Sequence, residues 1–203
     1  MQWPTLPQKV LQNAEEFGEK PALTQRKESG ETETLTWSEY SDYVMDISRS
    51  LLALGHEEGD RLSIYSFNRK EWFACYAASY FTNGAAVGVY HTCSPDEVEW
   101  IVGDSGSKFV FVGHNPQWGK DPDKLPRNRL SKILDSLPEV EHVIMLEDEE
   151  KIDHPKAMSW DEFLSKGSDV ETSAVEERIA NITPDLSLIH ISEPTRRTPI
   201  SYA

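Results

Sequence analysis

Residues 61–112 read RLSIYSFNRKEWFACYAASYFTNGAAVGVYHTCSPDEVEWIVGDSGSKFVFV, and this stretch decides the fold class. Apolar runs of strand length alternate in it with segments of helical spacing, in the order 61–67, 69–81, 85–90, 94–105 and 108–112. A predicted helix over 125–137 and a predicted strand over 142–146 continue the alternation. Strands separated by helices are typical of parallel βαβ units. The sequence therefore predicts an α/β fold with a mostly parallel sheet flanked by helices.

Helices and a hairpin are predicted on both sides of this stretch. A helix over 6–17 precedes two short strands, 22–25 and 34–36, which a charged loop joins. A Ser or Thr followed three residues later by Glu is the capping-box pattern, in which both side chains satisfy free amides at a helix start. The pattern occurs at Thr36 and Glu39, at Ser94 and Glu97, and at Ser159 and Glu162. We expect a helix to begin at each of these pairs.

The charge balance limits what the protein binds. Its 203 residues carry 35 acidic and 20 basic side chains, a formal net charge of −15. This excess repels phosphate backbones and anionic lipid, so we expect no nucleic acid partner. No apolar run approaches the roughly 18 residues of a spanning helix, and the first residues lack signal-peptide features. Two cysteines outside any CxxC pair predict reduced thiols and a cytoplasmic location.

Four sequence features invite a functional interpretation, and each has a simpler structural one. The Gly- and Ser-rich run 103–108 leads from a helix into a strand, the reverse of a phosphate-binding loop, so we expect a helix C-cap there. His91 lies two residues from Cys93 without a third, orienting group, and thiol chemistry at Cys93 stays a distant alternative. The other histidines lack metal-ligand spacing, and the acids at 147–150 are typical of a solvated loop. We therefore predict no catalytic, cofactor-binding or metal-binding residue in this chain.

Several weak motifs occur together in an order that is specific as a set. They are the helix start at 36–39, Gly55 followed by 59–61, NRKEW at 68–72, the strand 84–90 with Thr92, and the helix 97–105 entering KFVFVG. With these motifs the chain resembles the N-terminal part of the AMP-forming acyl-CoA synthetases, the adenylate-forming ligases. It looks most like their long-chain fatty-acyl and bubblegum-type branch, over roughly residues 6–185.

The resemblance implies an ATP-dependent activity for the intact parent. In that family a fatty acid carboxylate attacks the α-phosphate of ATP, pyrophosphate leaves, and the thiol of CoA displaces AMP from the acyl-adenylate. ATP, Mg²⁺ and CoA are thus implied for the parent, and some relatives rest on the periphery of a membrane. The family's phosphate loop, Tyr-Thr-Ser-Gly-Thr-Thr-Gly followed by Pro-Lys-Gly, does not occur in these 203 residues. The resemblance therefore transfers no catalytic residue.

Two hypotheses follow from these observations. The first is that residues 1–185 form an incomplete N-terminal domain of a long-chain fatty acid–CoA ligase, inactive alone, with part of its sheet surface uncovered. Its expected core residues are Trp72, Tyr76, Val87, Trp100, Ile101 and Phe109. The second is a stand-alone, non-enzymatic α/β module that binds a nucleotide or another protein.

The last 18 residues differ from the rest. They read LSLIHISEPTRRTPISYA, in which 186–196 looks like the translation of a transposon-end adapter used in sequencing libraries, and 200–203 matches a segment further along it. We expect residues 186–203 to be a non-native, disordered tail appended to a truncated reading frame. The alternative is a natural tail whose Ser/Thr-Pro and Arg residues serve phosphorylation or docking.

Amplification of intact genomic DNA across codon 185 tests the origin of this tail. The expected product continues into codons for the Ser/Thr/Gly-rich loop of the family. Recovery of the codons for 186–203 from genomic DNA would show that the tail is natural.

Overall fold

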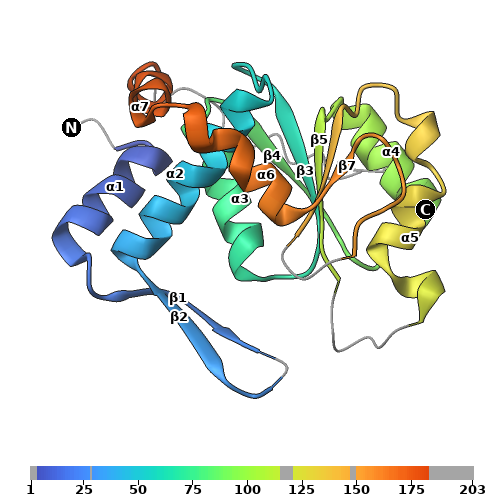
Figure 1. The fold of residues 1–203 in the computed structure, drawn as a ribbon, viewed down its shortest axis with the longest axis horizontal. Helices are drawn as coiled ribbons and strands as arrows, with labels where there is room; N and C mark the ends of the chain where they lie inside the picture. Colours follow the sequence, from blue (N-terminus) through green and yellow to red (C-terminus); the bar gives the residue numbers. More distant parts are fainter. Residues whose placement is uncertain (1–3, 28, 115–120, 147–149, 183–203) are drawn as a thin grey trace, which may run out of the picture.

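A five-stranded parallel sheet forms the centre of the computed structural model, which describes residues 4–27, 29–114, 121–146 and 150–182 (Figure 1). Its strands, in the spatial order β4-β3-β5-β6-β7, are β3 (Arg61–Tyr65), β4 (Ala85–Val89), β5 (Phe109–Val112), β6 (His142–Met145) and β7 (Ala157–Met158). Each neighbouring pair is parallel. The predicted α/β class is confirmed. The predicted tail, 186–203, and the acids 147–149 lie outside the described residues.

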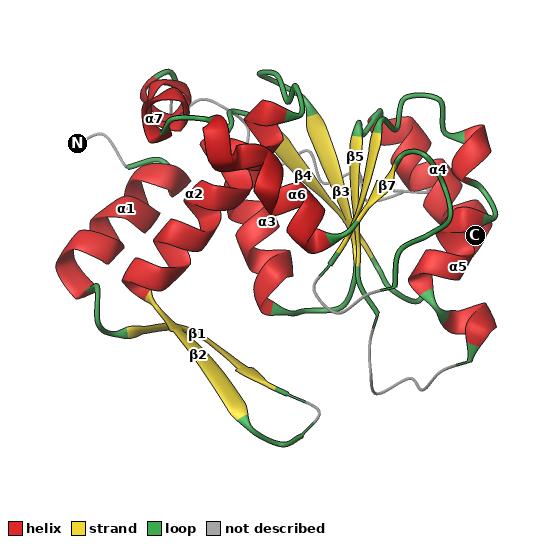
Figure 2. Ribbon diagram, in the orientation of Figure 1, coloured by secondary structure: helices red, strands yellow, loops and turns green. Residues whose placement is uncertain are grey.

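Helices cover both faces of this sheet (Figure 2). The helices α2, α3 and α6 lie on one side of it, and α4 and α5 lie on the other. The helical segments are α1 (Leu6–Phe17), α2 (Trp37–Ala53), α3 (Lys70–Phe81), α4 (Pro95–Ser105), η2 (Pro122–Lys124), α5 (Pro126–Ser131), η3 (Leu134–Ser136), α6 (Trp160–Lys166), η4 (Gly167–Asp169) and α7 (Thr172–Ala180). Among the described residues, no helix has the length and apolar character needed to cross a membrane.

Side chains of the central strands alternate between two hydrophobic clusters. In β5, Phe109 and Phe111 join the cluster formed with α2, α3 and α6, whereas Val110 and Val112 join the cluster formed with α4 and α5. All four are at most 1% exposed. The expected uncovered sheet surface is therefore not found on the central strands, both faces of which are packed against helices. In the edge strand β4, Gly88 is exposed.

The expected core is confirmed in part. Val87, Ile101 and Phe109 are buried, and Trp72 and Tyr76 are partly buried against the first cluster. Trp100 is 50% exposed, so its assignment to the core is wrong. The inward face of α4 consists of Val98, Ile101, Val102 and Ser105, which share a helical stripe that does not include Trp100.

The predicted capping boxes are all present. The carboxylates of Glu39, Glu97 and Glu162 accept the backbone N–H of the cap residue three positions earlier at 2.8, 2.8 and 2.7 Å. A fourth box, which the sequence analysis did not identify, uses Thr5 and Gln8 at the start of α1. These caps need no tertiary partner, which is why a local pattern predicts them.

The predicted helix over 125–137 is instead two shorter segments, α5 and η3. The hydroxyls of Ser131 and Ser136 donate to the carbonyls of Asn128 and Ile133, three residues earlier, and so compete with α-helical hydrogen bonding. Leu130, Leu134 and Leu137 stay buried in the second cluster. The apolar spacing therefore predicted correctly which residues are buried, but the prediction of one uninterrupted helix was wrong.

The predicted hairpin extends away from the body of the molecule (Figure 1). It consists of β1 (Pro21–Arg26) paired antiparallel with β2 (Thr32–Thr36). The first residue of α3, Lys70, holds it: its N–H donates to Gln25 Oε1 at 2.7 Å, and its Nζ pairs with Glu33 at 2.9 Å.

Residues 167–170, near the end of the described chain, pack against α2 and are hydrogen-bonded to it. The guanidinium of Arg49 donates to the carbonyls of Ser168 and Val170 at 3.0 and 2.6 Å. A Cβ at Gly167 would lie 2.7 Å from Ser50 Oγ, so η4 rests directly on α2. The first cluster accordingly includes Val10 of α1 together with Val175 and Ile179 of α7.

One histidine is enclosed where α2 ends and β3 begins. His56 is 1% exposed, and its ring centroid lies 5.5 Å from that of Phe109. Gly84 packs so closely that a Cβ at this position would lie 2.5 Å from His56 Cε1. Neither of its ring nitrogens has a hydrogen-bond partner in the described part of the chain. Burial is the main cause that lowers the pKa of His56, Asp60 opposes it, and Arg178 and Lys108 add to it, so that the pKa lies at about 4. His56 is therefore neutral at pH 7.

This histidine predicts a loss of stability in mild acid. The pKa of His56 in the folded chain lies below its ordinary value of 6.5. Between the two values, the unfolded chain is protonated at His56 while the folded chain is not. The free energy of unfolding should fall as pH decreases from about 6.5 to about 4, by up to about 3 kcal/mol from this group. Urea titrations of the His56→Leu variant should show a shallower dependence over that range. The control His154→Leu removes an imidazole whose side chain is 19% exposed. Its slope should stay closer to the parent's than that of His56→Leu, and equal slopes in all three proteins would contradict the assignment.

Candidate functional site: the carboxyl edge of the sheet

The strand order directs a ligand to the carboxyl ends of β3 and β5. After β3 the chain crosses through α3 to β4, and after β4 it crosses back through α4 to β5 on the opposite side of β3. The helices that follow the neighbouring strands β3 and β5, α3 and α5, consequently lie on opposite faces of the sheet. The crevice between β3 and β5 is where open α/β sheets bind ligands. The residues that follow β3, β4 and β5 form the candidate site.

The two central strands meet closely at this edge. The N–H of Gly113, directly after β5, donates to the carbonyl of Tyr65 at 3.1 Å. A Cβ at position 113 would clash with the hydroxyl of Ser66 and would lie 2.7 Å from Leu146 Cδ1. A residue without a side chain is thus required for β3 and β5 to end side by side.

Aromatic and basic side chains gather beside this junction. Phe67 follows β3, and its ring meets that of His91 edge to face at 6.4 Å. The guanidinium of Arg69 lies 5.9 Å from the Phe67 ring centroid, and it pairs with the fully buried carboxylate of Glu71 at 2.5 Å. Burial lowers the pKa of His91, and the charges of Arg129 and His114 lower it further. The imidazole of His91 is therefore neutral at pH 7, within a basic setting.

Arg129 of α5 fixes the loop that follows β4. Its Nη1 donates to the carbonyls of Thr92 and Cys93 at 2.8 Å each, and its Nε donates to the carbonyl of Asp123 at 2.8 Å. The hydroxyl of Tyr65 also donates to the Cys93 carbonyl, at 2.9 Å. Burial raises the pKa of Tyr65 to about 12, so this hydroxyl keeps its proton.

The features considered in the sequence take structural roles here. Burial raises the pKa of the Cys93 thiol, and the neighbouring carboxylate of Glu97 acts in the same direction, which disfavours the thiolate that thiol chemistry needs. Gly106 caps α4 with a φ of 60°, as the C-cap interpretation of 103–108 predicts.

The described residues do not assemble a metal site. In residues 4–27, 29–114, 121–146 and 150–182, no three His, Cys, Asp or Glu side chains converge as ligands for an ion.

Sequence reasoning missed the side chains that shape this edge. Ser66, Gly113 and His114 directly follow strands, and Arg129 lies 36 residues beyond the carbonyl that it binds. Their position after β3 and β5 was the available signal. The strand order that makes this position meaningful is not visible in the sequence.

A comparison with known protein families decides the identity of this fold. The family described as AMP-binding enzyme matches residues 10–184. This chain belongs to the AMP-binding enzyme family.

Curated members of the AMP-binding family include similar proteins from vertebrates. The long-chain-fatty-acid–CoA ligase ACSBG2 of Xenopus laevis is 24% identical over 193 residues, which are 94% of this chain and 25% of that protein. The protein of the same name from Gallus gallus is 29% identical over 189 residues, 92% of this chain and 24% of that one. The chain thus spans about a quarter of the length of these relatives.

Solved structures of ligases share the fold. The coronafacic acid ligase of Pectobacterium brasiliense superposes with a TM-score of 0.68 at 16% identity, over 84% of this chain and 31% of that one. The anthranilate CoA ligase AuaEII, in complex with anthranoyl-AMP, gives 0.64 at 18% identity, over 81% and 28%. The sheet and helices described above therefore correspond to part of a larger fold in these two ligases.

Arg129 should be the principal anchor of the loop after β4. The Arg129→Met variant removes three charge-assisted hydrogen bonds to carbonyls, and we expect it to lower the free energy of unfolding by about 2 kcal/mol. Hydrogen exchange of the amides at 91–94 should accelerate in the same variant. The control Arg127→Met loses an ion pair with Glu150, whose side chain is 78% exposed, and should change stability by less than about 0.5 kcal/mol. Similar losses in both variants would refute the anchoring role.

Proposed function

We propose that this chain is the N-terminal part of an ATP-dependent long-chain fatty acid–CoA ligase and is inactive by itself. The observation that carries the proposal is the continuous family match over residues 10–184, together with relatives that bear this ligase name. The alternative, a stand-alone nucleotide-binding or interaction module, draws its support from the two packed faces of the sheet.

The proposed reaction has two steps. A carboxylate oxygen of the fatty acid attacks the α-phosphorus of ATP and pyrophosphate leaves, which gives an acyl-adenylate. The sulfur of CoA then attacks the acyl carbon and AMP leaves. Both transition states carry developing negative charge, which such enzymes stabilise with a phosphate-binding loop and a lysine. That loop is absent from the 203 residues, so the part proposed for this chain is to build the sheet and its carboxyl edge.

The charge distribution at the edge supports this role. Fatty acid, ATP and CoA are all anions, and the protein has a net charge of −15. Nevertheless, the guanidinium of Arg129 lies beside the loop after β4, where it donates to the carbonyls of Thr92 and Cys93. Arg69 is neutralised by Glu71 and His91 is neutral, so Arg129 is the cation that this proposal uses. A cation beside a crevice raises the local concentration of anionic substrates. We also propose a cytoplasmic enzyme that meets its substrate at a membrane surface, because long-chain fatty acids partition into bilayers.

Calorimetric titration of the 203-residue chain tests the proposal. We expect no saturable heat with ATP or with a non-hydrolysable acyl-adenylate analogue up to about 1 mM, because the phosphate loop is missing. The full-length ligase of Gallus gallus serves as the positive control under the same conditions. Binding of ATP to this chain at micromolar concentration would favour the stand-alone nucleotide-binding module instead.

A further inference from the structure

A groove of about 630 Å³ lies between α4 and the segment that leads into β6. Apolar residues of that segment, among them Leu137, Pro138 and Val140, form part of its lining. Leu137 Cδ2 would lie 3.7 Å from a Cβ at Gly103, which shows how closely α4 approaches this segment. Leu137 and Val140 are themselves buried, so the floor of the groove is the outer surface of the second cluster.

Trp100 lines this groove with half of its surface exposed. Large aromatic side chains on the surface of a soluble domain commonly mark binding sites, because their burial by a partner removes much apolar area from water. The indole face also attracts cations, more strongly than the rings of Tyr or Phe do.

Four carboxylates line the groove together with the indole. Asp96 and Asp104 lie four residues before and after Trp100, on one stripe of α4, and Glu99 and Glu139 also line the groove. None of the four forms a salt bridge or a side-chain hydrogen bond within the described residues. The nearby cation Lys156 donates to the backbone carbonyl of Leu137 at 3.2 Å.

The spacing of the carboxylates selects the shape of a ligand. Eight residues separate Asp96 from Asp104, which is about 12 Å along a helix that rises 1.5 Å per residue. Carboxylates this far apart cannot converge on a metal ion or on one ammonium group. About four residues of extended peptide span the same distance. The apolar floor suits the aliphatic stems of arginine and lysine side chains.

We propose that this groove is a docking surface for a short arginine- and lysine-containing segment of a partner protein. A guanidinium stacks on Trp100, and neighbouring basic side chains pair with Asp96, Glu99 and Asp104. The choice of partner rests on charge complementarity, since the groove repels the anionic substrates of the proposed ligase. The groove is formed by α4 and the residues before β6, so it is a site separate from the carboxyl edge.

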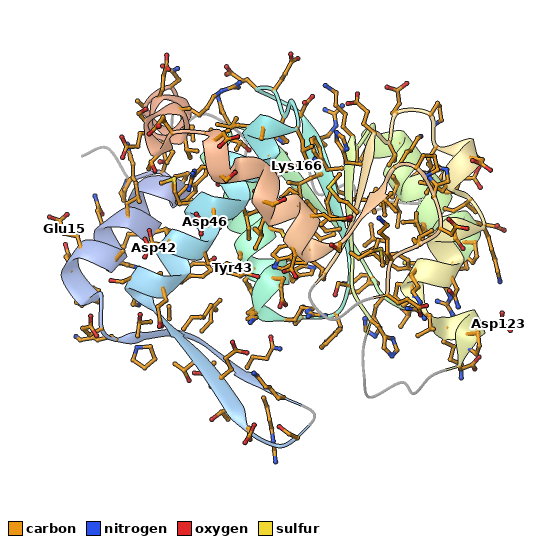
Figure 3. The ribbon with its side chains drawn as sticks, viewed as in Figure 1. Glu15, Asp42, Tyr43, Asp46, Asp123 and Lys166 are labelled. Carbon is orange, nitrogen blue, oxygen red and sulfur yellow. The ribbon has the colours of Figure 1, made fainter. Side chains whose placement is uncertain are left out.

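Isothermal titration of the full 203-residue chain with the peptide Ac-Arg-Leu-Arg-Arg-NH₂ at low salt tests the proposal. We expect saturable binding that the Glu99→Gln/Asp104→Asn double variant weakens about fivefold or more. Trp100→Ala should weaken it by a similar factor. The matched control Glu15→Gln/Asp42→Asn removes the same charge from α1 and α2, on the other side of the molecule from α4 (Figure 3), and should change affinity less than about twofold.

Three results would overturn the proposal. The first is the absence of saturable binding. The second is an equal loss in the control and groove variants, which would mean attraction by net charge alone. The third is binding of spermine as tight as that of the peptide with the same sensitivity to Trp100→Ala, which would assign the groove to a small polyamine. None of these results bears on the ATP titration, so the two proposals fail independently.

Discussion

Burial on both faces constrains β3 and β5, and the arrangement of the other elements depends on it. A strand with one packed face needs one layer of helices, whereas Phe109, Val110, Phe111 and Val112 project alternately into two hydrophobic clusters. A helix must therefore lie on each side, and the chain reaches both sides only by placing β4 and β5 on opposite flanks of β3. The crevice at the carboxyl edge is a geometric result of that crossing.

Local patterns predicted the parts of this fold that depend on local physics. Capping boxes, the hairpin and the apolar strands were predictable because neighbouring residues determine them. The two-residue strand β7 was not, because its pairing with β6 supplies the hydrogen bonds that define it. Residue type alone did not predict the position of Trp100. Tryptophan is often buried, but the residues of α4 that face the core are Val98, Ile101, Val102 and Ser105, and Trp100 lies outside this stripe. The carboxyl edge required the strand order, and the role of Arg129 required contacts between distant segments.

Charge is distributed unevenly over this acidic protein. Arginine and imidazole side chains lie near the carboxyl ends of the strands. Carboxylates line the groove on α4 instead. A uniform excess of acid would repel every anion equally. Segregation allows one edge to receive anions while another face attracts cations, and the two functions then need not compete for the same surface.

The contacts of Arg49 have a consequence for synthesis of the chain. Its guanidinium binds the carbonyl of Val170, 121 residues later, and the same cluster joins Val10 to Val175 and Ile179. A ribosome delivers the N-terminus first, so α1 and α2 emerge long before α6 and α7 can cover them. During that interval their apolar faces stay open to other proteins. The apolar surface that α1 and α2 present to α7 is therefore covered only once translation has passed residue 179.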